Sequence, residues 1–135
     1  MSKNPLPRSR TLTAAEIQDF SHVRDHLLDN VRLLRTNLIP PAAAGMTIGK
    51  FVLLRDDHIM RTSSTLLAHE LVHVRQFAEM GAPRFLFTYL SEYVRNLWRC
   101  RNHHQAYLDI SLEVEARAVA NQWRTDLAKD TGTPE

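Results

Sequence analysis

The chain has 135 residues, of which 44% are hydrophobic and 24% are charged, and its formal net charge is +2. This length fits one globular domain with a modest core, and the apolar content excludes a disordered chain. No uncharged apolar run approaches the roughly 18 residues of a membrane-spanning helix, and the weak, scattered positive charge gives no argument for nucleic-acid binding.

The first third of the sequence predicts a tail and then a helix. Residues 1–12 are interpreted as a flexible tail. Residues 13–16 (TAAE) have the form of a capping box, in which a threonine hydroxyl and a glutamate carboxylate bond the free amides at a helix start. Apolar residues then recur every three or four positions as far as Leu34, which predicts one long amphipathic helix ending near Thr36.

The middle of the sequence changes character. Residues 46–55 (MTIGKFVLLR) are rich in strand-forming side chains and predict a strand at 47–54, with a shorter extended piece at 58–61. The bounds of the remaining predicted segments follow from capping residues, from apolar periodicity and from the stop signal of Gly81 and Pro83. The predicted segments are helices at 64–80, 83–99 and 111–129, a polar loop at 100–110 and a flexible tail at 130–135.

These elements predict a single α+β domain over residues 13–129, predominantly helical, with a small β-sheet or hairpin. The broad apolar face of the third predicted helix, from Phe85 to Trp98, is expected to belong to the core rather than to a groove or membrane surface. One cysteine, Cys100, excludes an intramolecular disulfide. Because the sequence also opens without the apolar segment of a secretory signal, we expect a cytoplasmic protein.

The helix predicted at 64–80 carries the pattern HExxH, as His69, Glu70 and His73. Residues four apart on a helix differ by about 40° in direction and about 6 Å in height, so both imidazoles lean to one side. This arrangement suits two ligands of one Zn²⁺, and Glu70 is placed to take a proton from a nearby water. Chance would supply the pattern roughly 0.02 times in a chain of this composition. We therefore interpret it as a metal site rather than as a pair of core histidines.

A catalytic metal site needs a third protein ligand, and the last predicted helix offers two carboxylates. Glu115 shares a face with Val119 and Trp123, whereas Glu113 is expected to face solvent and pair with Arg117. A carboxylate on a buried stripe is costly unless it is paired or binds a metal. We therefore predict Glu115 as the ligand and Glu113 as the alternative. The remaining candidates are Asp109, His103 and His104.

These motifs resemble the gluzincin branch of the zincin metallopeptidases, in which an HExxH helix supplies two histidine ligands and the base, and a downstream glutamate completes the site. The strings LLAHELVHVRQF (66–77) and EVEARA (113–118) carry the resemblance and are also similar to small bacterial zincin-like domains. The resemblance implies a minimal zincin-like fold and zinc-dependent hydrolysis of peptide or protein substrates. It also implies one Zn²⁺ per chain, held by His69, His73 and Glu115.

In a site of this kind, Glu70 would act as the general base and then return the proton to the leaving amine. Tyr107, eight residues before Glu115, is the first candidate for stabilising the transition-state oxyanion, ahead of His103 and His104.

The sequence departs from the gluzincin pattern at one point. Many gluzincins place an aspartate two or four residues after the ligand glutamate, but these positions hold Arg117 and Val119. The group that orients the first histidine must then come from elsewhere, with Asp109 or a backbone carbonyl as candidates. The free edge of the strand at 47–54 could hold an extended peptide by strand addition, or the strand could simply complete the core.

Two other classes of function stay open. One is a non-catalytic zinc domain, although structural zinc needs no base beside it. The other is a regulatory or interaction module, in which the long first helix and four arginines bind a partner protein or nucleic acid. These arginines are Arg84, Arg95, Arg99 and Arg101. A domain of this size leaves little room for a second lobe, so a homodimer or a partner could complete a substrate cleft.

Overall fold

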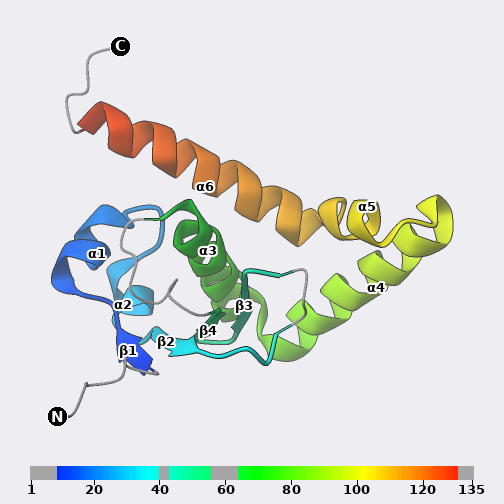
Figure 1. Cartoon of the computed structure of the whole chain (residues 1–135), viewed down its shortest axis with the longest axis horizontal. Coiled ribbons are helices and arrows are strands. Elements are labelled where there is room, and N and C mark those ends of the chain that lie inside the picture. The colour runs from blue at the N-terminus through cyan, green and yellow to red at the C-terminus, as the bar shows by residue number, and fades with distance from the viewer. Residues whose placement is uncertain (1–8, 40–42, 56–63, 131–135) are drawn as a thin grey trace, which may run out of the picture.

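The computed structural model describes residues 9–39, 43–55 and 64–130. Within them the chain has the predicted α+β fold, predominantly helical with one small sheet (Figure 1). The strands are β1 (Ser9–Thr11), β2 (Arg32–Arg35), β3 (Gly45–Ile48) and β4 (Phe51–Leu54). The helices are α1 (Ala14–Asp19), α2 (Asp25–Leu28), α3 (Thr65–Met80), α4 (Ala82–Cys100), α5 (His103–Leu108) and α6 (Ser111–Asp130).

The long first helix predicted from the apolar spacing is wrong. The capping box does start a helix, but α1 ends at Asp19 because the backbone of Phe20 leaves the helical region. The short helix α2 and the strand β2 follow, and β2 bonds β1 on one side and β4 on the other. Leu33 is thereby fully buried in the sheet. The periodic apolar residues therefore mark burial in a common core, not one continuous helix.

The single strand predicted at 47–54 is a β-hairpin. Gly49 has a φ of 62°, a conformation that glycine adopts without strain, and it turns β3 back onto β4. The sheet order is β1-β2-β4-β3, with β2 parallel to β4 and the other pairs antiparallel. Strand β3 therefore lies at one edge. The extended piece predicted at 58–61 lies outside the described residues.

The C-terminal half follows the prediction more closely. Helices α3, α4 and α6 lie within a residue or two of their predicted bounds, and Gly81, with a φ of 82°, separates α3 from α4. The polar loop predicted at 100–110 is wrong in part, because α5 forms within it. Asn102 caps that helix by accepting a hydrogen bond from the amide of Gln105. Helix α4 leads away from the sheet to α5, and α6 returns across α3 (Figure 1).

The core lies between the sheet and the helices, and α3 contacts the sheet on one side and α6 on the other. A smaller cluster joins α3 and α4 to the start of α6 through Phe77, Phe85, Ile110 and Leu112. The expectation that the broad apolar face of α4 belongs to the core is wrong in part. Phe85, Tyr89 and Tyr93 pack in this cluster, but several other large side chains of α4, Trp98 among them, are exposed. No helix in the described part of the chain is both long and apolar enough to cross a membrane.

The predicted flexible ends are partly ordered. Residues Ser9–Thr11 of the predicted tail form β1, and α6 extends to Asp130, while residues 1–8 and 131–135 lie outside the described part. Arg10 on β1 binds the buried carboxylate of Glu16 through two contacts of 2.7 and 3.0 Å. The amide of Thr13 donates a third hydrogen bond to Glu16, at 2.8 Å. Burial alone would raise the pKa of Glu16, but these partners together lower it.

We expect Glu16→Gln to reduce the free energy of unfolding at pH 7 by about 1–3 kcal/mol, because it removes the charge-assisted bonds from Arg10. The pKa of Glu16 in the folded protein lies below its ordinary value of 4.5. The stabilisation is therefore complete above that value and is lost as the pH falls through the lower folded pKa. Urea denaturation of both proteins from pH 7 to pH 2 should show their difference shrinking below about pH 4.5.

The matched control is Glu79→Gln, since the Glu79 side chain is mostly exposed and lies 3.8 Å from its partner Arg75. It should change stability little at any pH. A difference between wild type and Glu16→Gln that stays constant over the whole range would contradict the assignment.

Candidate metal centre

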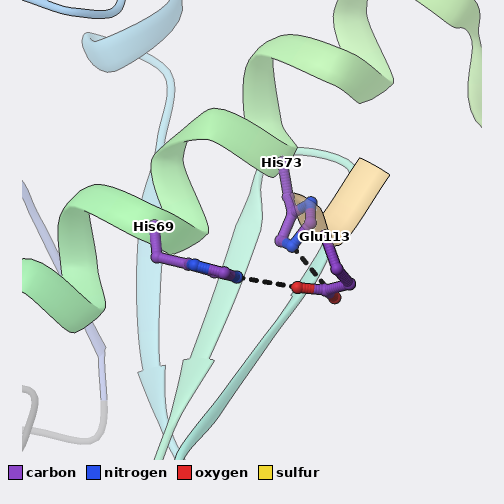
Figure 2. A group of neighbouring side chains, drawn as sticks. All are labelled: His69, His73 and Glu113. Carbon is purple, nitrogen blue, oxygen red and sulfur yellow. Dashed lines mark hydrogen bonds and ion pairs between the residues drawn. The ribbon is translucent and has the colours of Figure 1, made fainter. Parts of the chain in front are cut away.

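Helix α3 presents two imidazoles toward the start of α6. Ser64 caps the helix by accepting a hydrogen bond from the amide of Leu67, and most of the α3 surface is buried. His69 and His73 lie one turn apart, with ring centroids separated by 5.0 Å. Both point to the same side, as the HExxH spacing predicts (Figure 2).

The carboxylate that meets these imidazoles belongs to Glu113. Its Oε1 lies 2.8 Å from Nε2 of His69, and its Oε2 lies 3.2 Å from Nε2 of His73 (Figure 2). One donor atom from each of the three residues lies within 4.8 Å of the others. Two imidazole nitrogens and one carboxylate oxygen form a donor set suited to a divalent cation such as zinc.

The prediction of Glu115 as the third ligand is corrected by this geometry. The side chain of Glu115 is half exposed, accepts a hydrogen bond from Gln76 at 2.7 Å and forms an ion pair with Arg75 at 3.0 Å. The buried stripe of α6 includes Ala116 and Ala120, and Glu113 lies on it three residues before Ala116. Ala116 and Ala120 thus lie on the face that packs on α3, whereas Ala118 between them is exposed, so the alanines alone do not select Glu113 from the sequence.

The minor candidates for a ligand lie elsewhere. Asp109 accepts a hydrogen bond from Gln105, and His103 bonds Tyr93. His104 is exposed. The pairing of Glu113 with Arg117 is also wrong, because Arg117 donates to the backbone oxygen of Leu108.

Gln76 orients the second histidine, a role that the sequence interpretation missed. Its amide nitrogen faces two groups that can only accept, the backbone oxygen of Leu112 and the carboxylate of Glu115. Its amide oxygen therefore faces Nδ1 of His73, at 2.7 Å, and that nitrogen carries a proton. The lone pair of a neutral His73 then resides on Nε2, a buried atom without a well-directed hydrogen bond. A metal ion would satisfy that atom, so the residues present fit a bound cation.

Two tyrosines hold the buried carboxylate of Glu113 from a second direction. Tyr89 on α4 donates to Oε2 at 2.6 Å, and Tyr107 on α5 donates to Oε1 at 3.2 Å. Burial alone would raise the pKa of Glu113, but the hydrogen bond from His69, the nearby imidazole of His73 and the hydrogen bond from Tyr89 hold it far below its usual range. Burial and the charge of Glu113 in turn raise the pKa of both tyrosines. Tyr107 therefore reaches the site, as its predicted role requires, and Tyr89 was missed.

Glu70 lies on the side of α3 that faces strand β3. Its buried carboxylate oxygen Oε1 lies 2.9 Å from the hydroxyl of Thr47, which also lies 3.0 Å from the backbone oxygen of Glu70. A Cβ at Gly45 would make an ordinary contact with Cγ of Glu70, at 3.4 Å, and a tight contact with Leu54, at 3.1 Å, so the glycine mainly leaves room for Leu54. Burial raises the pKa of Glu70, although the charges of His73 and His69 act against that rise. A carboxylate with a raised pKa beside a metal site can accept and return a proton.

Fold and site together define a small α+β protein with an HExxH helix and a candidate three-donor metal centre. Residues 5–81 match the family model described as the eCIS core domain, which is more than half of the chain. The chain therefore belongs to the eCIS core domain family. The matched segment includes both histidines and Glu70 but ends before Glu113. No curated protein and no solved structure gives a significant match.

We expect Glu113→Gln to lower the pKa of His73 in metal-free protein. Burial acts to lower the pKa of His73, and hydrogen bonding and charge from Glu113 raise it above 6.5 overall. Without that carboxylate charge, the pKa should fall to its ordinary value or below. NMR titration of the imidazole signals after chelator treatment measures the change. Glu115→Gln is the control and should leave the pKa of His73 raised. An unchanged value in Glu113→Gln would contradict the assignment.

Proposed function

We propose that this protein is a zinc-dependent peptidase in which His69, His73 and Glu113 hold the metal and Glu70 is the general base. The observation that carries the proposal is the convergence of two Nε2 atoms and one carboxylate oxygen within 4.8 Å. The two histidines and Glu70 occupy the positions of the HExxH pattern. The gluzincin-like prediction is retained in this proposal, with Glu113 in place of Glu115.

A bound Zn²⁺ would supply Lewis acidity, which acidifies a water molecule and polarises the carbonyl of the scissile bond. Tyr89 and Tyr107 hold the carboxylate of Glu113 in place, while Gln76 keeps a proton on Nδ1 of His73 and so leaves Nε2 to face the metal position. These groups organise the site before a substrate arrives.

Glu70 performs the proton transfers in the proposed reaction. Its carboxylate takes one proton from the attacking water as the new C–O bond forms, and returns it to the amine as the C–N bond breaks. Burial raises the pKa of Glu70, which favours a base able to hold that proton between the two steps. Thr47 lies 2.9 Å from the Glu70 carboxylate and limits its rotation.

Strand β3 offers a binding place for the substrate. It lies at the edge of the sheet and packs against α3, with Thr47 directed at Glu70. An extended peptide could add to this edge through backbone hydrogen bonds and lie across the site. Tyr107 is partly exposed and donates its one hydroxyl proton to Glu113; in the proposed reaction this hydroxyl turns from Glu113 to donate to the oxyanion once substrate is bound. A second protein molecule could cover the outer side of such a peptide, as the small size of the domain suggests.

The ligand set predicts which variants keep zinc. Wild-type protein dialysed against excess zinc and desalted should hold about one zinc per chain, and His73→Ala and Glu113→Gln should hold almost none, because each loses a donor. Glu115→Gln should keep its zinc, because Glu115 contacts Gln76 and Arg75 and neither of the two histidines. Elemental analysis of the four proteins measures this. Zinc lost from Glu115→Gln but kept in Glu113→Gln would reverse the assignment.

The proposed base is tested by Glu70→Gln, which keeps the shape of the side chain and removes its ability to accept a proton. It should retain zinc and folding while hydrolysing fluorescein-labelled casein about 10²–10⁴ times more slowly. Glu79→Gln, on the exposed face of the same helix, should hydrolyse casein at the wild-type rate. No cleavage by zinc-loaded wild type, or equal cleavage by Glu70→Gln, would contradict the proposal. Retained zinc without hydrolysis in wild type would favour the non-catalytic alternative.

A further inference from the structure

Helix α4 carries a continuous apolar stripe on its outer surface. Its five large side chains have exposed fractions from 47% to 76%, and they line a shallow hollow together with Ser91 and Arg95. The five are Leu86, Phe87, Leu90, Val94 and Trp98. They span about 18 Å along the helix at 1.5 Å per residue. Exposed side chains of this size and continuity usually mark a contact surface.

The exposed charged residues around the stripe are positive. Four exposed arginines belong to α4 and its C-cap, and no acidic side chain of the described residues forms an ion pair with them. They are Arg84, Arg95, Arg99 and Arg101. The acidic residue of α4, Glu92, is bound to the backbone and hydroxyl of Ser111 at 2.7 and 2.9 Å. The guanidinium of Arg101 lies over the Trp98 ring, 5.1 Å from its centroid.

We propose that α4 is a docking surface for an anionic lipid membrane and lies in the plane of its headgroups. Leucine, phenylalanine and tryptophan on one face, flanked by arginine, form the pattern of helices that bind the membrane interface. The stripe and its hollow belong to one helix, so they form a ridge rather than a groove with two walls. A ridge suits fluid acyl chains, which adapt to its shape. Helix α4 also projects from the sheet-bearing part of the molecule (Figure 1).

The positive charge of α4 disfavours a second copy of the chain as the partner that covers the stripe. Pairing of two identical α4 faces would bring arginines of one molecule toward arginines of the other, without acidic partners between them. An anionic surface instead attracts each arginine. Docking of α4 on a membrane requires neither bound zinc nor peptidase activity.

The two tryptophans allow a direct test with the full chain. Trp98 is 76% exposed, whereas Trp123 is 3% exposed and donates a hydrogen bond to the backbone oxygen of Asp19. Adding vesicles of equimolar phosphatidylglycerol and phosphatidylcholine should shift the tryptophan emission to shorter wavelength. Vesicles of phosphatidylcholine alone should cause little change. Trp98→Phe should abolish the shift but still sediment with the anionic vesicles, because phenylalanine keeps the apolar contact.

Variants separate the two parts of the surface. Arg84→Gln/Arg95→Gln should weaken binding about 25-fold, since each basic residue near an anionic surface contributes about fivefold. Phe87→Glu/Leu90→Glu should weaken it by more than about 100-fold, because two apolar anchors are lost. Leu38→Glu is the matched control, since Leu38 is 90% exposed and belongs to the segment after β2 rather than to the α4 stripe. Circular dichroism checks that each variant is folded.

Several outcomes would overturn the proposal. Folded wild-type protein that ignores anionic vesicles would point to an acidic protein segment instead. Equal binding to both kinds of vesicle would remove the role of the arginines. A dimer in sedimentation that Phe87→Glu/Leu90→Glu converts to monomer, without binding to vesicles, would assign the stripe to a second copy.

Discussion

The carboxylate of Glu113 is the group on which the C-terminal half of the molecule converges. It receives contacts from two histidines on α3, from Tyr89 on α4 and from Tyr107 on α5, while its own backbone belongs to α6. A buried carboxylate is tolerated only where several donors compensate for lost hydration. The same set of donors that makes Glu113 acceptable in the interior also brings α3, α4, α5 and α6 to one point.

A second layer of polar contacts supports this point. Gln76 bridges His73 to the carboxylate of Glu115, and Arg75 forms an ion pair with that carboxylate. Glu115 therefore belongs to the support of the site although it does not face the histidines. On the opposite side, Thr47 connects Glu70 to the edge of the sheet. The site is thus fixed by both the sheet and the C-terminal helices.

The sequence predicts correctly those features that depend only on residues close together in the chain. The HExxH spacing, the capping box and the stop at Gly81 each depend on a few neighbouring residues, and each is present in the structure. The prediction of one long first helix is wrong because apolar spacing indicates burial and not the type of secondary structure. After Phe20, pairing of β2 with distant strands is favoured over continued helix. Glu115 was preferred over Glu113 because bulky apolar neighbours were weighted above small ones. Alanines on α6 mark close packing, which only the approach of α3 reveals.

The segment that matches the eCIS core domain ends at residue 81, between α3 and α4. The nitrogen donors of the candidate centre lie inside it, and the oxygen donor lies 40 residues after His73, on α6. The candidate centre therefore combines two segments: the segment that matches the family contributes the two histidines, and the chain beyond it contributes Glu113. A fragment cut at Gly81 would retain its imidazoles and its proton acceptor but would lack an anionic ligand. The candidate centre would consequently bind a cation only when the two segments are folded together.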